Sequence, residues 1–275
     1  MIEDARPRKI LRTLGLIAIV IAFVFPVYWL LSFSFKPERL FFDLPPVWTF
    51  DPIVTEWVNT FRTLKLWETI INSIIVAGGS TLLTILVGTP ASYSLARLRV
   101  RGKTDIMLFI IASRMAPAVA LIIPFFLIYQ FLDLLDSHIG LIFAYSTFNM
   151  ALYVWLLTVM TRELPADLEG VAEADGYHPF QVFLRIGLPL MRPSIIAVGV
   201  LAFIFAWNEF PFALLLGGRT TETLPVVAAR SLSAGGVEWA RLAVISTVMV
   251  IPVAVMVFFL HKQIVRGLSM GAVRG

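Results

Sequence analysis

The feature that most constrains this chain is a series of six apolar stretches, each long enough to cross a bilayer as a helix. Crossing about 30 Å of hydrocarbon takes roughly 20 helical residues. Only 15% of the 275 residues are charged and 59% are hydrophobic, which leaves too little polar surface for a water-soluble domain. The sequence therefore predicts an all-α integral membrane protein with six transmembrane helices. They cover residues 14–35, 69–96, 106–132, 138–160, 194–216 and 240–260.

The third stretch is the least regular of the six, because it contains Arg114 and the prolines Pro117 and Pro124. Proline removes a backbone donor and can break or kink a helix. We still expect residues 106–132 to cross the membrane as one span.

The distribution of basic residues indicates how the spans are oriented. Four segments on one side, residues 1–13, 97–105, 161–193 and 261–275, hold 14 of the 22 Lys and Arg residues. Because such residues are enriched in cytoplasmic loops, both termini are predicted to be cytoplasmic. The net charge of +4 follows from this orientation and gives no indication of a nucleic-acid partner.

These assignments divide the chain into five parts. The external loop is rich in proline and aromatic residues, so we expect it to be a packed structure rather than a flexible linker. The parts are a cytoplasmic N-terminus (1–13), a first transmembrane helix (14–35), the external loop (36–68), a transmembrane domain of five helices (69–262) and a cytoplasmic C-terminal tail (263–275).

The chain shows no pattern typical of catalysis, of a metal site or of nucleotide binding. It has no cysteine, which excludes disulfides and thiolate chemistry. Gly102, Lys103 and Thr104 are similar to the end of a phosphate-binding loop, but Arg97 stands where that motif needs its first glycine. The histidines lack metal-ligand spacing. We therefore expect this chain to have no catalytic residue and to bind no cofactor or metal.

The longest cytoplasmic segment, residues 161–193, has the pattern of two short helices joined by a turn. Pro165 can occupy the first turn of a helix, and Gly176 can end it in the left-handed conformation. Pro179 is expected to begin a second helix, which Pro189 ends. Helical spacing places on one face of the first helix Leu164, Leu168, Val171, Ala172 and Asp175, and on the other Asp167, Glu169 and Glu173.

This first helix is too short to be stable alone in water, so it needs a surface to pack against. Burying Leu168 and Val171 is worth about 1.5–3 kcal/mol each. The surface could be the chain's own helical bundle, the lipid interface or another protein. Because residues 165–176 contain no Lys or Arg, anionic lipid is disfavoured and a protein partner is favoured.

Gly176, followed after nine residues by Ile186 and then by Leu188 and Pro189, matches the signature loop of the permeases of ATP-binding-cassette importers. The chain resembles that family over nearly its whole length, and most closely the shorter membrane subunit of maltose-type carbohydrate importers. The further segments that carry this resemblance are Asn72-Ser73, Ala206-Trp207-Asn208-Glu209-Phe210 and the ending from Gly267-Leu268 to Gly275.

One position departs from the family pattern. The signature begins Glu-Ala-Ala, and here these positions hold Gly170, Val171 and Ala172, while Glu169 lies one residue earlier. The resemblance implies that the loop forms a coupling helix that docks on an ATPase subunit. The residues that it assigns to this coupling are Leu168, Glu169, Gly170, Val171, Ala172, Asp175, Gly176, Leu188 and Pro189.

The resemblance also implies the fold and the partners. The fold would be that of type I (MetI-like) importer permeases, with the coupling helix between the fourth and fifth spans. The chain would be a non-catalytic subunit in a bacterial or archaeal plasma (inner) membrane, where it forms half of a carbohydrate pathway with a second permease. Two ATPase subunits would bind ATP and Mg, and an external binding protein would deliver the solute.

Other functions stay open on the sequence alone. The solute of the same machine could be a polyol or glycerol phosphate. Alternatives of another class are an ion-coupled secondary transporter, for which the chain lacks a repeated half with broken helices, and a structural membrane subunit.

Polar side chains inside the spans are the candidates for the solute pathway. Arg114 and Glu209 are charged, and charges within spans normally face a cavity or a partner. Tyr145, Asn149 and Asn208 can hydrogen-bond either a polar solute or a neighbouring helix. Whether Arg114 and Glu209 pair is open, because they lie roughly 12 and 22 Å from the inner ends of their spans at the helical rise per residue.

Overall fold

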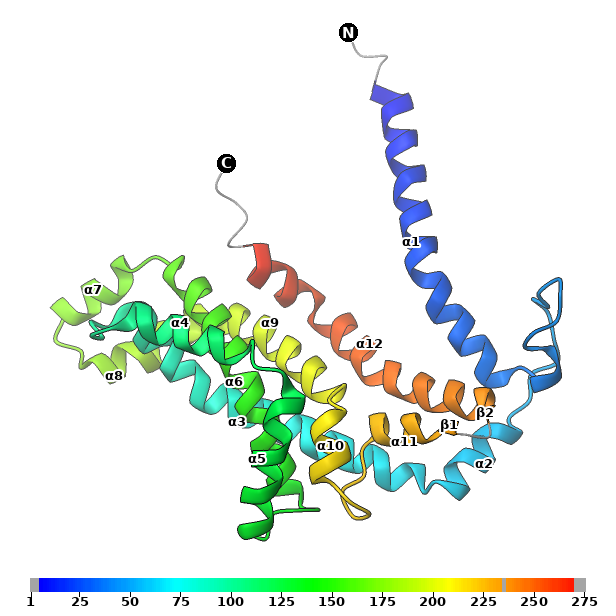
Figure 1. Ribbon diagram of the computed structural model, residues 1–275. Coiled ribbons are helices and arrows are strands. Elements are labelled where there is room, and N and C mark those ends of the chain that lie inside the picture. Colours follow the sequence, from blue (N-terminus) through cyan, green and yellow to red (C-terminus); the bar gives the residue numbers. More distant parts are fainter. Residues whose placement is uncertain (1–4, 234–235, 270–275) are drawn as a thin grey trace. The chain divides into compact units, whose positions relative to one another are not determined.

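The computed structural model describes residues 5–233 and 236–269, and most of these are helical (Figure 1). Within them, five helices are long and apolar enough to cross a membrane. The predicted all-α membrane fold is therefore confirmed, with one short antiparallel hairpin as an addition. The five are α1 (Ala5–Phe35), α3 (Leu66–Arg97), α6 (His138–Arg162), the run from Pro179 to Trp207 that contains α9 (Leu188–Trp207), and α12 (Trp239–Ser269); the hairpin pairs β1 (Leu232–Ser233) with β2 (Gly236–Val237).

The two terminal helices extend into the segments predicted to be cytoplasmic tails. Helix α1 already begins at Ala5 and α12 continues to Ser269, so much of the two terminal segments is helical. Residues 1–4 and 270–275 of these tails lie outside the described residues. The chain forms two compact units, one of residues 1–66 and 227–251 and the other of residues 67–226 and 252–275.

In the first unit, the loop that follows α1 folds back on the end of that helix. The backbone N–H of Ile53 donates to the carbonyl of Phe35 at 2.8 Å, and the Phe33 and Phe41 rings stack with centroids 4.5 Å apart. The loop includes the 3-10 helix η1 (Glu38–Leu40) and leads into α2 (Thr55–Thr63). The packed loop expected from its aromatic residues is thus present.

The side chain of Lys36 is buried inside this loop and holds it together. Its Nζ donates to the carbonyl of Val47 at 2.9 Å and lies 4.7 Å from the ring centroid of Trp29, 5.3 Å from Phe33 and 5.1 Å from Phe50. Burial lowers the pKa of this ammonium group, and the aromatic faces offset part of the cost of removing it from water.

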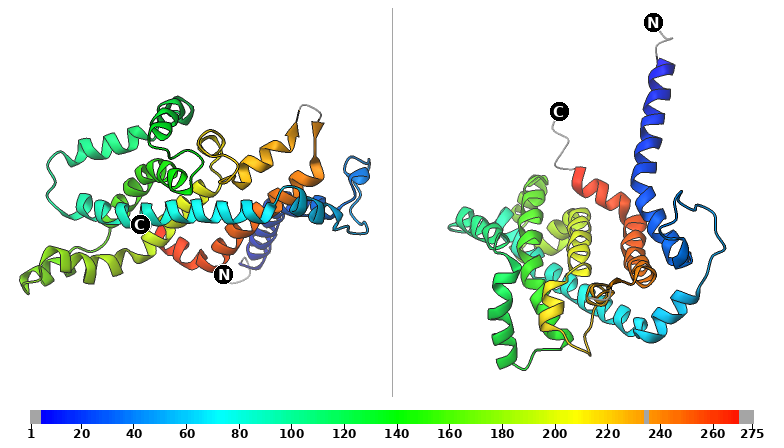
Figure 2. Two further views of the ribbon diagram at one scale, coloured as in Figure 1. Left: turned by 90° about the horizontal axis from the view of Figure 1, so that it is seen from below. Right: turned by 45° about the vertical axis from the view of Figure 1, so that its right-hand side comes forward.

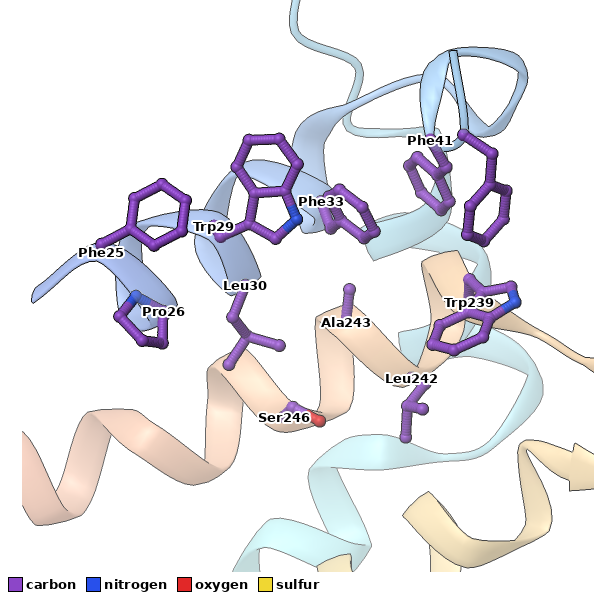
Figure 3. A pocket seen from close by; sticks show the side chains of 11 residues that line it. Phe25, Pro26, Trp29, Leu30, Phe33, Phe41, Trp239, Leu242, Ala243 and Ser246 are labelled. Carbon is purple, nitrogen blue, oxygen red and sulfur yellow. The ribbon is translucent and has the colours of Figure 1, made fainter. Parts of the chain in front are cut away.

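An apolar groove of about 630 Å³ also lies in this unit (Figure 3). Side chains from α1, such as Trp29 and Leu30, face side chains from the start of α12, such as Leu242 and Ala243, with Trp239 at one end. Nearly all of its lining is apolar, which suits contact with lipid tails or another apolar surface.

In the second unit, α6 is the central helix and packs against α9, α4 and α10. The core between α3, α6 and α9 contains Tyr93, Tyr153, Leu157 and Met191, all buried. The Tyr153 hydroxyl shares a 2.9 Å hydrogen bond with Thr89 across this core. The remaining elements here are α4 (Lys103–Ser113), α5 (Ala118–Phe131), α7 (Asp167–Ala174), α8 (Pro179–Val182), the π-helical segment η2 (Phe183–Gly187), α10 (Pro211–Leu216) and the start of α11 (Leu224–Arg230), whose later residues belong to the first unit.

The prediction of one continuous third span over residues 106–132 is wrong. Helix α4 ends at Ser113 and α5 begins after Pro117, and the two run in clearly different directions in Figures 1 and 2. Pro117 lacks a backbone donor and disfavours the helical conformation in the residue before it, which ends α4. Pro124 lies inside α5 without ending that helix.

The fifth span also differs from its prediction over residues 194–216. Helix α9 ends at Trp207, and α10 begins only at Pro211. In the break, the Asn208 side chain donates to the carbonyl of Ile204 at 2.8 Å and the Glu209 carboxylate accepts from the N–H of Phe212 at 3.3 Å. Such local side-chain bonds compete with the helical pattern, and Pro211 has no N–H to continue it.

Pro189 does not end the helix that begins at Pro179, contrary to the prediction. Helix α8, η2 and α9 follow one another without interruption, and Pro189 lies in the first turn of α9. The preceding turn is π-helical, with the N–H of Leu188 bonded to the carbonyl of Phe183. Proline is tolerated here because its missing N–H falls where the hydrogen-bond register changes.

Candidate functional site

The segment that the sequence predicts to be cytoplasmic contains the predicted short helix, α7, but this helix begins two residues later than expected. The N–H groups of Glu169 and Gly170 both bond to the carbonyl of Ala166, at 3.0 and 3.2 Å, so Pro165 lies before the first turn. Gly176 has a φ of +85°, and the N–H of Tyr177 bonds to the carbonyl of Ala172 at 3.0 Å. The left-handed glycine that ends this helix is thus confirmed, and the bond is that of a Schellman motif.

The two faces of α7 are arranged differently from the prediction. Leu168 and Val171 are 53% and 61% exposed, whereas Ala172 is 6% and Glu169 only 7% exposed. Glu169 was expected on an outward polar face, and that expectation is wrong. The side chain of Glu173 lies outside the described residues. The helix therefore presents two large apolar side chains and buries a carboxylate.

Glu169 is buried because α3 supplies partners for both of its oxygens. The Tyr93 hydroxyl donates to Oε2 at 3.1 Å, and Arg97 Nε donates to Oε1 at 3.1 Å. Arg97 also donates from Nη2 to the carbonyl of Leu164 at 2.8 Å, just before α7. Tyr93 and Arg97 were not predicted as site residues, because no local sequence motif marks them.

The other residues assigned to coupling fall into two groups. Gly170, Asp175 and Gly176 are exposed, and an added Cβ at Gly170 would meet nothing within 4 Å. A side chain in the family's glutamate position would therefore point away from this chain. Leu188 and Pro189 belong to the first turn of α9 rather than to α7.

Four of the five pathway candidates line one small pocket in the second unit, namely Arg114, Tyr145, Asn149 and Glu209. Asn208 lies elsewhere, exposed and bonded to its own helix. Arg114 and Glu209 reach the same pocket because each lies at a helix break: Arg114 follows the end of α4, and Glu209 follows the end of α9.

Each polar group in the pocket has a partner within the chain. Arg114 Nη1 donates to the carbonyl of Phe148 at 3.0 Å, and its guanidinium lies 5.2 Å from the ring centroid of Phe205. The Tyr145 hydroxyl donates to the carbonyl of Glu209 at 3.4 Å, and Asn149 Nδ2 donates to the carbonyl of Ala202 at 3.1 Å.

The pocket is too small for a sugar. Its volume is about 40 Å³, close to that of one water molecule, whereas ligand sites usually measure about 300–1,000 Å³. Arg114 and Glu209 have opposite charges and both line this pocket, and within the described part of the chain no direct ion pair joins them. The pocket is therefore better described as a packed polar contact between the two helix breaks than as a ligand site.

A second polar cluster links the starts of α3 and α6 to the loop before α11. Asn72 Nδ2 donates to the carbonyls of Thr220 and Glu222, at 3.0 and 3.2 Å, and its Oδ1 lies 2.8 Å from His138 Nε2. The hydroxyl of Ser73 accepts from the N–H of Leu224 at 2.8 Å. The Asn72-Ser73 pair noted in the sequence thus holds this loop in place.

Asp136 binds the same loop. Its Oδ1 accepts hydrogen bonds from the N–H and hydroxyl groups of Thr221, at 3.0 and 2.8 Å, and from the N–H of Thr220 at 3.2 Å. Partial burial acts to raise the pKa of Asp136, but the hydrogen bonds from the two threonines outweigh it and the pKa is lowered.

Replacing Asp136 by asparagine is expected to speed hydrogen exchange at the Thr220 and Thr221 amides by about tenfold or more, since bonds to a charged acceptor contribute about 1.5–3 kcal/mol. Hydrogen-exchange mass spectrometry in nanodiscs measures this. Because the folded pKa is depressed, the stabilisation is present above the ordinary carboxyl pKa of about 4 and is lost as the pH falls through the lower folded value. Unchanged exchange in the variant would contradict the role of the carboxylate.

Comparison with known proteins places these features in a family. The model of the binding-protein-dependent transport system inner membrane component matches residues 85–270. The trehalose transport system permease protein SugB of Mycobacterium tuberculosis is 34% identical over 91% of this chain and 92% of its own. The trehalose/maltose transport system permease protein MalG of Thermococcus litoralis is 30% identical over 98% of both chains.

A solved structure supports the fold. The chain of a bacterial ABC transporter involved in the import of the acidic polysaccharide alginate matches with a TM-score of 0.74, 19% identity and coverage of 95% of this chain and 98% of its own. At that identity the likeness concerns the fold alone. Since the family model covers more than half of the chain and relatives of 30% identity or more span nearly all of it, the chain belongs to the inner membrane components of binding-protein-dependent transport systems.

Proposed function

We propose that this chain is the permease subunit of an ATP-driven importer that carries a carbohydrate delivered by an external binding protein. The observation that carries the proposal is the exposed apolar face of α7, formed by Leu168 and Val171. On the opposite face of this cytoplasmic helix, Glu169 is bonded to α3 and holds the helix in place. The trehalose and maltose named for the two relatives support the carbohydrate class.

The proposed partners would supply the nucleotide binding for which this chain has no motif, and they would cover the exposed apolar face of α7. Two separate ATPase subunits bind ATP and Mg, and each permease offers one coupling helix to them. Two further apolar side chains, Tyr177 and Phe180, lie just after α7 and are 38% and 62% exposed. Burying such side chains in a groove of the ATPase stabilises docking by about 1.5–3 kcal/mol for each large residue. Both termini of the permease lie on the same cytoplasmic side.

The solute pathway is proposed to form between this chain and a second permease. The pocket of Arg114, Tyr145, Asn149 and Glu209 holds about one water, so this part of the chain does not enclose a sugar by itself. In this proposal the pocket changes shape when α9 moves, and its polar groups then contact the solute.

Introducing carboxylates on the outward face of α7, as Leu168→Asp and Val171→Asp, is expected to abolish both solute uptake and solute-stimulated ATP hydrolysis. A charge transferred into an apolar groove costs several kcal/mol unless it is paired. The assay uses proteoliposomes that contain both permeases, the ATPase subunits and the binding protein. A matched control is Leu44→Asp, at a leucine that is 90% exposed in the first loop.

The control is expected to keep full stimulation, and the two α7 variants should still fold and pair with the second permease. Full stimulation in the α7 variants would refute the coupling assignment. The same vesicles test the solute class: disaccharide uptake supports the proposal, whereas uptake of glycerol phosphate or a polyol in its place would overturn the carbohydrate assignment.

A further inference from the structure

Tyr93 occupies the point where three elements of the second unit meet. It lies on α3 and is only 6% exposed. Its hydroxyl donates to Glu169 on α7, and its ring lies 4.9 Å from that of Phe183 in the π-helical segment η2. One side chain therefore contacts the coupling helix with its polar end and the start of α9 with its apolar body.

The backbone of the π-helical segment packs directly against the ring of Tyr93. Gly187 closes η2, and a Cβ added there would lie 2.6 Å from Cε2 of Tyr93 and 3.2 Å from its Cδ2. These distances leave no room for any side chain at position 187. Single π-helical turns inside α-helices are frequently found at functional sites. Here the turn and the glycine together allow α9 to begin directly against the tyrosine.

Arg97 lies one helical turn after Tyr93 and contacts the same carboxylate. The side chains of Arg97 and Glu169 are 11% and 9% exposed, so this charged pair is shielded from water. Hydrogen bonds between charged groups are roughly twice as strong as neutral ones. Through its second bond, to the carbonyl of Leu164, Arg97 also holds the chain just before α7.

From this geometry we infer that Tyr93 and Arg97 are positioning residues that transmit the movement of the coupling helix to α3 and α9. Glu169 is the shared contact on α7, and the Tyr93 ring carries displacement to η2. Close-packed interiors transmit strain rather than absorb it. Helix α9 then leads to the break at Asn208 and to the Arg114–Glu209 pocket. This inference rests on the proposed function and specifies how docking reaches the pathway.

The decisive variant is Tyr93→Phe, which keeps the ring and removes only the hydroxyl that donates to Glu169. In the complete reconstituted transporter, the number of solute molecules imported per ATP hydrolysed is expected to fall at least about fivefold, while assembly with the ATPase subunits stays normal. A fivefold effect corresponds to about 1 kcal/mol, the usual contribution of one hydrogen bond. Tyr129→Phe, at a tyrosine of α5 that is likewise 6% exposed, is the matched control and should leave the ratio unchanged.

A charge exchange tests Arg97. Arg97→Glu and Glu169→Arg are each expected to lower the transport-to-hydrolysis ratio, and the double variant to recover at least half of it, because the exchanged pair can form the same contact in reverse. A purely structural role would change assembly or thermal stability and leave the ratio of the assembled complexes unchanged.

The outcomes separate the two proposals. If Leu168→Asp and Val171→Asp abolish stimulation but Tyr93→Phe behaves like the unmodified chain, the relay is refuted and the coupling assignment stands. If the α7 variants themselves have no effect, the proposed function fails first. Loss of assembly in Tyr93→Phe would also overturn the relay, since the contact would then be needed for folding and not for transmission.

Discussion

Replacing Gly176 by valine is expected to abolish solute-stimulated ATP hydrolysis in the reconstituted transporter while leaving subunit assembly largely intact. Gly176 has a φ of +85°, a conformation that a β-branched residue adopts only at a cost of about 1–2 kcal/mol or more. The valine would shift the backbone and break the bond from the N–H of Tyr177 to the carbonyl of Ala172. The end of α7 would then no longer present its apolar face correctly. ATP hydrolysis with and without the loaded binding protein measures the effect.

Two controls isolate the backbone as the cause. A Cβ at Gly176 would meet nothing within 4 Å, so asparagine, which tolerates the left-handed conformation, should retain most of the stimulation. Gly102→Val places the same strain at a φ of +68° before α4, outside the coupling segment, and should leave coupling unaffected. Equal loss in Gly176→Val and Gly176→Asn would point to the surface of the turn and not to its backbone.

Replacing Arg114 by glutamine is expected to lower solute uptake at least about tenfold, the equivalent of about 1.4 kcal/mol. The glutamine is too short to keep the bond to the carbonyl of Phe148 without a shift, and it removes the positive charge opposite Glu209. A carboxylate left in a low-dielectric pocket without its opposite charge is costly and distorts its surroundings. Uptake of labelled solute into proteoliposomes gives the measurement.

The double variant Arg114→Gln with Glu209→Gln decides between two roles for this pair. If the two charges act on each other, removing both restores part of the uptake, because no charge is left without its opposite. If each contacts the solute, the losses add. Arg114→Lys serves as the control that keeps the charge and should retain most of the uptake. Normal uptake in Arg114→Gln alone would exclude the pocket from the pathway.

The long helices were predictable from the sequence to within a few residues at most of their ends. Helices α3, α6 and α12 contain the expected spans, because bilayer thickness sets the length of an apolar helix. The two breaks were not predictable. Pro117 and Pro211 flank breaks, yet Pro90, Pro124 and Pro252 lie inside helices. A proline has the same local chemistry at all these places, and only the partners available to the freed backbone groups differ.

The candidate site likewise has one part that was predictable from the sequence and one part that was not. Gly176 was predicted because a left-handed helix end has a local signal, namely glycine after the last helical residue. The burial of Glu169 was not predicted, because Tyr93 and Arg97 lie 76 and 72 residues away in the chain. The spacing of residues in a helix indicates which side chains share a face, but not which face finds partners elsewhere.

By itself the sequence determined that this chain lies in a membrane, where most of its long helices lie, and that a short helix ends at Gly176. These properties depend on local amino-acid composition and on the fixed thickness of the lipid bilayer. Only the tertiary structure decided that Leu168 and Val171 face outward, that Glu169 is held by α3, and that two helix breaks meet at one pocket. The physical reason is that hydrogen bonds and ion pairs across the core join residues that are distant in the chain, and these contacts outweigh local preference.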